Sequence, residues 1–342
     1  MYHLHSPKGW DHRSRVMSYS IEVLRKDATF VPEVRSPTVR RRELGALLRA
    51  LRTGNGLTVE QVAERLLCSP SKVSRMETGH GTATPRDIRD LCDLYGVTDE
   101  AERARMMRLS HESKQQGWWH SHDLEFGTYV GLEEDAIATG YYQSTIIPGV
   151  LQTADYARAV HEVVLPKLLP DRIEELVEVR MIRQRRLTQD NPPRFTAVLD
   201  EAALHRWVGG RRVMAAQLDK ILEMSALPNI AVQVLPYRLG AHPAMESNFI
   251  IIELPPPTPG VVFVEGLIGS LYLERSDDLD RYHAVFEQLQ AIALNPKDTV
   301  DLIATLARSY KDDLEAVLRV FLNFYTDVLV YLQGRSCERR LP

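Results

Sequence analysis

The residues best suited to chemistry in this 342-residue sequence are a short polar and cationic group in its N-terminal third. Ser71, Lys72 and Arg75 are spaced at i, i+1 and i+4, which places them on one side of a helix whose opposite side carries Val73 and Met76. A small, polar and cationic face suits an anionic partner. Lys72 falls in the first helical turn, where the helix dipole disfavours a cation by up to about 1 kcal/mol, so its position indicates a nearby anion such as a phosphate.

Two closely joined helices must position this face. Thr58 with Gln61 three residues later predicts a capping box at the start of the first helix. Ser69 followed by Pro70 predicts the start of the second, almost directly after the first ends. The helix before this pair carries an apolar stripe at i, i+3, i+4 and i+7, made of Leu44, Leu47, Leu48 and Leu51. This arrangement is typical of a helix-turn-helix, whose second helix enters the major groove of DNA.

The residues from Leu57 to Ala63 (LTVEQVA) and from Cys68 to Gly79 (CSPSKVSRMETG) resemble the Cro/repressor-like (XRE) helix-turn-helix regulators. The resemblance implies a five-helix bundle and a set of DNA-contacting residues. These are Thr58, Ser69, Ser71, Lys72, Ser74 and Arg75. We expect Ser69 and Lys72 to anchor the helix on the DNA backbone, and Ser71 and Arg75 to read base edges, Arg75 through a bidentate contact to guanine. Arg52 and Glu77 fall where that family has a buried structural ion pair.

Two positions depart from the pattern of that family. Val59 stands where many members have a glutamine that contacts phosphate, which puts that contact in doubt. Leu67 stands in place of the usual glycine of the turn. Because a left-handed conformation is unfavourable for a residue with a Cβ, Leu67 predicts a strained turn that costs about 1 kcal/mol, and it leaves the crossing angle of the two helices open.

The charge of the chain is unevenly distributed. The 42 Lys+Arg and 46 Asp+Glu residues give a net charge of -4, which argues against a nucleic-acid partner if it is taken as an average. Residues 1–118, however, hold 20 basic and 15 acidic side chains, a net of +5, whereas residues 119–342 hold 22 and 31, a net of -9. DNA binding is therefore expected in the N-terminal part alone.

After Trp118 the pattern changes to apolar and β-branched runs that alternate with helical periods, which predicts an α+β domain. The expected strands are residues 145–150, 195–199, 230–235, 248–254, 261–264 and 270–273. The expected helices are residues 153–164, 171–188, 212–225, 276–294 and 298–310.

Several stretches of this second region resemble the C-terminal domain of actinobacterial regulators of the WhiJ type. The resemblance rests mainly on residues 147–157 (IPGVLQTADYA), 180–186 (RMIRQRR), 199–204 (LDEAAL) and 271–274 (LYLE). It implies a sensing or partner-binding role, in which a small-molecule effector or a small partner protein changes the affinity for DNA.

The predicted fold class is an all-α five-helix helix-turn-helix domain followed by a larger α+β domain. We expect a flexible N-terminal arm at residues 1–37, the DNA-binding domain at 38–116, the α+β domain at 117–310 and a helical tail at 311–342. The tail carries an apolar face that either packs on the domain or forms a dimer contact.

Other residue groups favour structural over chemical interpretations. His120 and His122 with Asp123 and Glu125 form only a weak candidate metal site, and we expect none. A second group could act as an acid/base group but is more simply explained as the cap and first turn of a helix: Asp200, Glu201 and His205. Four aromatic residues either pack in the core or line a ligand cage: Trp118, Trp119, Tyr141 and Tyr142.

The sequence predicts a cytoplasmic, sequence-specific transcriptional regulator that is not an enzyme and uses no cofactor or metal. Three widely spaced cysteines and the lack of an apolar membrane-spanning run agree with that location. Residues 38–80 hold only 8 basic side chains, so we expect a homodimer on two DNA half-sites about 34 Å apart. The alternative is an antitoxin-like protein-interaction module that regulates its own operon.

Overall fold

Five helices form the N-terminal region of the computed structural model, which describes residues 36–122, 124 and 126–312. They are α2 (Pro37–Gly54), α3 (Val59–Arg65), α4 (Pro70–Glu77), α5 (Pro85–Leu94) and α6 (Glu100–Glu112). The predicted five-helix bundle is confirmed. Three of these helices begin where capping residues stood in the sequence, because Thr58, Ser69 and Thr84 each accept a hydrogen bond from a first-turn amide.

The bundle core forms where the apolar stripes of these helices meet. Its buried members include Leu44, Leu48, Val62, Val73, Met76, Ile88, Leu91 and Met106. The closest backbone approach is at Gly45 of α2, where an added Cβ would lie 2.6 Å from the carbonyl oxygens of both Met76 and Glu77. Glycine at this position therefore lets α2 lie directly against the end of α4.

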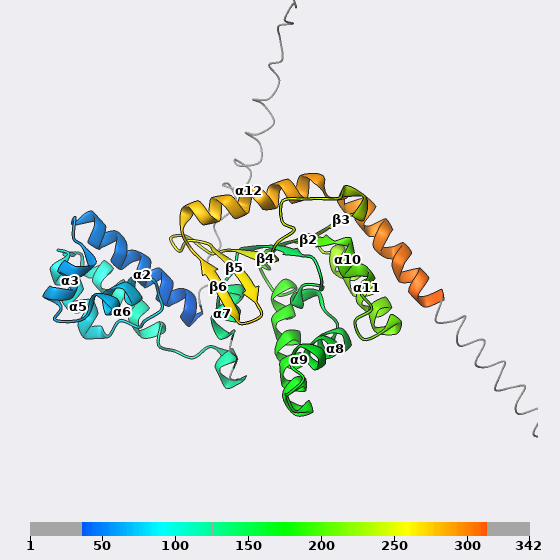
Figure 1. Cartoon of the computed structure of the whole chain (residues 1–342). Coiled ribbons are helices and arrows are strands. Elements are labelled where there is room, and N and C mark those ends of the chain that lie inside the picture. The colour runs from blue at the N-terminus through cyan, green and yellow to red at the C-terminus, as the bar shows by residue number, and fades with distance from the viewer. Residues whose placement is uncertain (1–35, 123, 125, 313–342) are drawn as a thin grey trace, which may run out of the picture. The chain divides into compact units, whose positions relative to one another are not determined.

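A six-stranded mixed sheet forms the centre of the second region (Figure 1). Its strands are β1 (Ala138–Gln143), β2 (Arg194–Asp200), β3 (Ile230–Leu235), β4 (Phe249–Glu253), β5 (Val261–Gly266) and β6 (Gly269–Leu273). They follow the order β3-β2-β1-β4-β5-β6. The first three strands are parallel, and β4, β5 and β6 are added antiparallel on the other side of β1.

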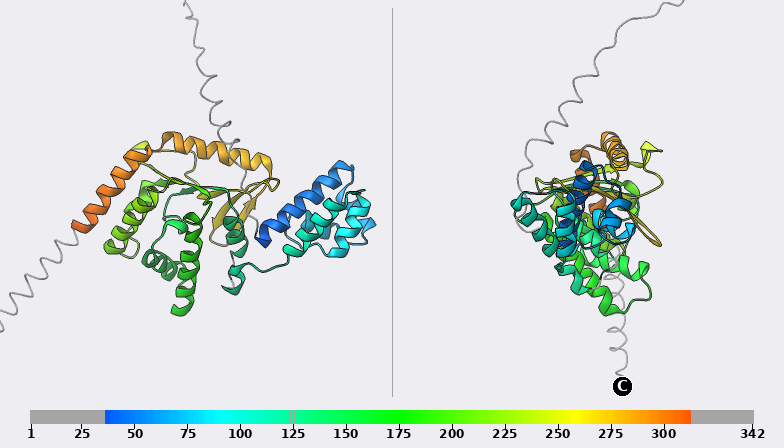
Figure 2. Two further views of the ribbon diagram at one scale, coloured as in Figure 1. Left: turned by 180° about the vertical axis from the view of Figure 1, so that it is seen from behind. Right: turned by 90° about the vertical axis from the view of Figure 1, so that its left-hand side faces the viewer.

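Helices cover both faces of this sheet, as Figures 1 and 2 show. On one side lies α12 (Ser276–Ile292). On the other lie α7 (Gly127–Glu134), α8 (Ala154–Val164), α9 (Pro170–Gln184), α10 (Glu201–His205) and α11 (Arg211–Ser225), while residues 296–312 form a further helix. Short 3-10 turns are η1 (Trp118–His122), η2 (Gly149–Leu151), η3 (Arg185–Leu187) and η4 (Tyr237–Leu239). The predicted α+β class is confirmed.

Successive side chains of β1 point to opposite faces of the sheet and enter the two different cores of this region. Tyr141 is 2% exposed and belongs to the larger core, whereas its neighbour Tyr142 is 1% exposed and packs with Phe286 of α12 in the smaller one. Both rings are core residues, as is Trp119, which is 3% exposed. Of the two interpretations left open by the sequence, these contacts favour core packing.

The prediction of a strand at residues 145–150 is wrong. The strand of this part of the chain is β1, which ends at Gln143, and the apolar run after it is a buried turn that contains η2. Ile147 and Val150 are buried in the core, so burial and not strand formation explains their apolar character. Pro148 and Gly149 interrupt the run, and proline cannot donate to a central ladder.

Helix α2 contributes to both cores. Its first turn places Val39 in the larger core, whereas Leu44 and Leu48 belong to the bundle. Ser36, the N-cap of α2, donates a hydrogen bond through Oγ to the carbonyl oxygen of Gly131 in α7 at 2.7 Å.

Most of the expected N-terminal arm and of the C-terminal tail lies outside the described residues. Among the helices of the described part, none is long and apolar enough to cross a membrane.

Candidate nucleic-acid interface

Helix α4 presents one buried and one exposed face. Val73 is 1% exposed and Met76 is 3% exposed, and both pack into the bundle core. The side chains of Ser69, Ser71, Ser74 and Arg75 are exposed, as the helical spacing predicted for Ser71 and Arg75. The helix thus offers three hydroxyl groups and one guanidinium to the solvent.

Arg75 is the exposed cation of this face. Its guanidinium makes no hydrogen bond or ion pair with any residue that the structure describes, so all five of its N–H donors are available to a partner. Its backbone is fixed, because the Gly81 amide donates to the Arg75 carbonyl oxygen at 2.9 Å. A planar, unpaired guanidinium on a fixed helix is suited to a bidentate contact.

Lys72 lies next to this face but is already paired. Its Nζ donates to Oδ1 of Asp87 on α5 at 2.7 Å, and its side chain is only 39% exposed. Burial alone raises the pKa of the Asp87 carboxyl, but the hydrogen bonds from Lys72 and Thr84 lower it overall. The anion indicated by the position of Lys72 in the first turn is therefore present within the chain.

The turn between α3 and α4 has the strained geometry predicted from Leu67. Leu67 adopts a φ of 50°, in the left-handed region, and its side chain is 94% exposed. The amide of Cys68 donates to the carbonyl oxygen of Ala63 and that of Leu67 to Glu64, which is the pattern of a Schellman motif. Leucine thus occupies the position at which such motifs favour glycine.

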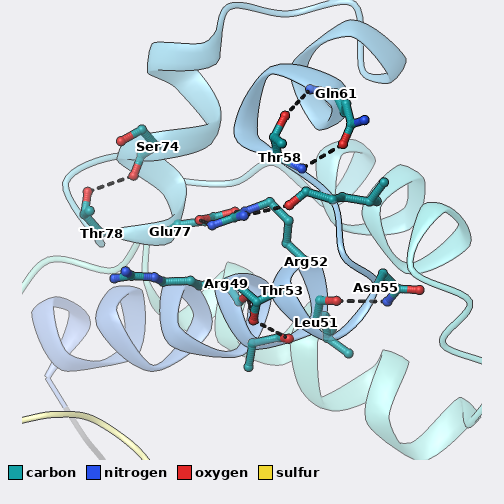
Figure 3. Close-up of polar contacts among 12 residues, drawn as sticks. Arg49, Leu51, Arg52, Thr53, Asn55, Thr58, Gln61, Ser74, Glu77 and Thr78 are labelled. Carbon is teal, nitrogen blue, oxygen red and sulfur yellow. Dashed lines mark hydrogen bonds and ion pairs between the residues drawn. The ribbon is translucent and has the colours of Figure 1, made fainter.

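The capping box at the start of α3 is present and places a hydroxyl at the edge of the interface. The amide of Gln61 donates to Oγ1 of Thr58 at 3.2 Å, and the amide of Thr58 donates to Oε1 of Gln61 at 2.9 Å (Figure 3). Hydrogen bonds from its own backbone amide and from the Thr58 side chain lower the pKa of Glu60, so the Thr58 hydroxyl already has an acceptor in the first turn of α3.

The expected Arg52–Glu77 pair joins α2 to α4 (Figure 3). Arg52 donates through Nε to Oε1 of Glu77 at 2.7 Å and through Nη2 to Oε2 at 2.9 Å. A third donor, Nη1, reaches the carbonyl oxygen of Leu57 just before α3 at 2.8 Å. The hydrogen bonds to Glu77 raise the pKa of Arg52, and one side chain thus ties three helices of the motif together.

The acid/base candidates of the larger region serve as caps and links. Asp200 accepts the Ala202 amide at 2.8 Å and caps α10. Glu201 accepts the Tyr237 amide at 2.7 Å and lies 3.3 Å from Nε2 of His205. These contacts favour the structural interpretation of the three residues.

The histidines of the weak metal candidate both lie in η1. Asp123 and Glu125 fall outside the described residues. Within the part of the chain that is described, no group of three or more potential ligands is close enough to hold a metal ion.

The larger region contains a buried ionic network for which the sequence has no signal. Arg183 of α9 donates through Nε to Oε2 of Glu133 at 2.6 Å and through Nη2 to Oε1 at 2.9 Å. The hydroxyl groups of Tyr129 and Tyr141 each lie 2.7 Å from Oε1 of Glu133. Burial raises the pKa of this carboxyl, but Arg183 and the two hydroxyl groups lower it overall, so Glu133 is ionised.

A buried histidine lies near Arg183 and Arg180. His161 of α8 is 6% exposed, and its Nε2 has no hydrogen-bond partner among the described residues. Burial, followed by the charges of Arg180 and Arg183, lowers the pKa of His161 to about 4. His161 is therefore neutral at physiological pH.

Comparison with known families identifies two regions of the chain. Residues 43–106 match the model described as a helix-turn-helix domain, and residues 126–305 match the model described as a domain of unknown function, DUF5753. No curated protein and no solved structure matches the chain. The helix-turn-helix match supports DNA binding by the N-terminal region.

Proposed function

This chain belongs to the DUF5753 family, and we propose that it is a sequence-specific transcriptional regulator whose larger region senses an effector or a small partner protein. The observation that carries the proposal is the face of α4, where an unpaired Arg75 lies among three exposed hydroxyl groups in a domain that matches the helix-turn-helix model.

In the proposed mode of binding, α4 lies in the major groove of double-stranded DNA. Arg75 and Ser71 read base edges, while the hydroxyl groups of Thr58, Ser69 and Ser74 contact the backbone at its borders. The pair between Arg52 and Glu77 keeps α4 at a fixed angle on α2, which holds the base-reading groups in register.

The ion pair with Asp87 supports a positioning role for Lys72 in place of the phosphate contact expected from the sequence. The two roles differ in the salt dependence of DNA binding, because each phosphate contact contributes about -0.9 to the slope of log K against log salt. We expect Lys72→Met to leave the slope unchanged. A slope that becomes shallower by about one unit would assign Lys72 to a phosphate.

We propose that the protein binds as a homodimer on two half-sites about 34 Å apart. The few cations of one helix-turn-helix domain support this, since residues 38–80 hold 8 basic and 4 acidic side chains. Sedimentation of the protein–DNA complex and the footprint on the selected site measure the stoichiometry. One protein chain on a single half-site would contradict the dimer.

The test of the proposed function is selection of bound fragments from genomic DNA by the full chain, followed by measurement of variants on the enriched site. Arg75→Ala is expected to cost about 1–3 kcal/mol on that site and to relax selectivity at one base position. Arg86→Ala is the matched control, because Arg86 is 84% exposed but lies on α5. Equal losses on selected and random DNA would contradict base reading, and failure to enrich any sequence would contradict the function itself.

A role without catalysis or cofactor is part of the proposal. The use of Asp200 and Glu201 as hydrogen-bonding caps supports it. In the antitoxin-like alternative, partner binding by the larger region is the main activity. One exposed surface of that region is suited to binding a partner.

A further inference from the structure

An exposed surface lies at the carboxyl ends of β2 and β3. The two strands are parallel, and their last residues, Asp200 and Leu235, are partners in the register. Because parallel strands end at the same edge of a sheet, the segments that follow them meet there. The chain after β2 forms α10, and the chain after β3 forms η4.

Five exposed side chains from these two segments form what we call the aromatic–arginine face. They are His205, Arg206, Trp207, Tyr237 and Arg238. Trp207 is 52% exposed and Tyr237 is 58% exposed, which is unusual for large rings that lie above a packed core.

Neighbouring groups hold both rings in place. The ring of His205 stacks on that of Tyr237 at 5.7 Å between centroids, and Arg211 lies over the Trp207 ring at 4.2 Å. Tyr310 meets Trp207 edge-on at 6.3 Å. Rings that are already ordered in the free protein lose little conformational entropy when they are covered, which favours binding.

The cations of the face lack partners of their own. The guanidinium groups of Arg206 and Arg238 make no hydrogen bond or ion pair with the described residues. The nearby carboxylates are already engaged, since Asp200 caps α10 and Glu201 accepts the Tyr237 amide. The face is thus a cationic area within a region, residues 119–342, whose net charge is -9.

We propose that the aromatic–arginine face docks an acidic segment of a second protein. Carboxylates of that segment pair with Arg206 and Arg238, and an apolar side chain covers Trp207 and Tyr237. The inference rests on the proposed partner-binding role of the larger region. Tryptophan, tyrosine and arginine are the residues enriched at the centres of protein interfaces, where a few side chains carry most of the affinity.

The surrounding charge favours a protein over DNA as the occupant. DNA carries one negative charge per about 1.7 Å of its length, so a duplex lying on this face extends its charge across an acidic region that repels it. A short segment with a few carboxylates meets the arginines with little of that repulsion. All the cations of the face are arginines, which is also typical of protein interfaces.

The probe for this proposal is a displayed library of short random peptides selected on the full-length chain. We expect enrichment of peptides that combine Asp or Glu with an aromatic or aliphatic residue. The best peptide, measured by fluorescence anisotropy, should bind about 10-fold or more weakly to Trp207→Ala and to Tyr237→Ala, and likewise to the double variant Arg206→Glu/Arg238→Glu. Trp207→Phe should restore most of the affinity, and added salt should weaken binding.

Matched controls lie elsewhere on the same region. Arg275→Glu/Arg281→Glu changes the charge by the same amount through exposed arginines of other segments. Leu267→Ala/Ile268→Ala removes two fully exposed apolar side chains from the β5–β6 turn. Neither control should change peptide affinity, and thermal unfolding should show that all these variants remain folded.

Three results of the peptide experiment would overturn the proposal. They are no enrichment, enrichment of peptides without acidic residues, and equal binding to the face variants and the wild type. A loss of DNA affinity in Arg206→Glu/Arg238→Glu that matches the loss in Arg75→Ala would assign the face to DNA and overturn it as well. Failure of the wild type to select any DNA sequence would contradict the proposed DNA-binding function alone, and not the docking of an acidic segment.

Discussion

The helical region and the α+β region each contain a bidentate arginine–glutamate pair, and the two pairs differ in the polar groups around them. The exposed fractions are similar, 13% and 6% for Arg52 and Glu77 against 7% and 9% for Arg183 and Glu133, but Glu133 also accepts from two tyrosine hydroxyl groups. The first pair stood out in the sequence through its position in a known motif. The second did not, because nothing in a sequence shows which charges will be enclosed together. The number of buried polar groups that depend on each carboxylate should therefore set how much each pair contributes to stability.

The largest effect is expected from Glu133→Gln. Loss of the carboxylate leaves Arg183 buried without a counter-charge, which costs about 3–5 kcal/mol in the free energy of unfolding. Tryptophan fluorescence during urea unfolding is a suitable measurement, since Trp118, Trp119 and Trp207 all lie outside the five-helix bundle. The double variant Glu133→Gln/Arg183→Met should recover part of the loss. A cost below about 1 kcal/mol would contradict the expected difference between the two pairs.

The next effect is the pH dependence contributed by His161. Its pKa is about 4 in the folded protein and about 6.5 in the unfolded chain, so the unfolded state binds the additional proton between these values. Stability should therefore fall as pH decreases from about 6.5 to 4, by at most about 1.4 kcal/mol per pH unit. His161→Phe should flatten this part of the curve, while the exposed control His111→Gln should not. An unchanged slope in His161→Phe would contradict the assignment.

A smaller loss is expected from Glu77→Gln in the bundle. It removes the charge from a pair that no tyrosine hydroxyl group shares and leaves Arg52 with its hydrogen bond to Leu57, so the cost should be about 1–3 kcal/mol. Far-UV circular dichroism during urea unfolding follows this helical region. If Glu77→Gln costs as much as Glu133→Gln, the two tyrosine hydroxyl groups on Glu133 do not set a difference between the pairs.

The smallest effect is a gain in stability from Leu67→Gly. Glycine adopts the φ of 50° without the steric cost of a Cβ, and the exposed leucine side chain contributes little packing, so the change should stabilise by about 1 kcal/mol. Leu67→Ala separates the two causes, because it removes the side chain but keeps the Cβ. A stabilisation by alanine equal to that by glycine would show that backbone strain is not the reason.

The two regions also differ in how far the sequence predicted them. The caps at Thr58 and Ser69 are local signals, and they place α3 and α4 correctly because a helix start depends on residues within one turn. The turn at residues 145–150 was mistaken for a strand, because an apolar run reports burial and not backbone conformation. Strand β1, which pairs on both sides with distant segments, lacks such a run.

The candidate interface likewise combines features that local sequence predicts with features that depend on distant residues. Its exposed residues could be predicted from helical periodicity, since Val73 and Met76 fixed which side of α4 is buried. The engagement of Lys72 by Asp87 could not, because the partner comes from another helix. The aromatic–arginine face is likewise assembled from segments after β2 and β3 that only the sheet brings together.

The sequence by itself determined the helix-turn-helix, the face of α4 that meets solvent, the strained turn at Leu67 and the separation of charge between the two regions. All of these depend on residues close in the chain or on simple counts. The tertiary structure alone decided which charges are paired: Lys72 with Asp87, and Glu133 with Arg183. Such pairs depend on how distant elements pack, and packing also sets the burial on which their energies depend.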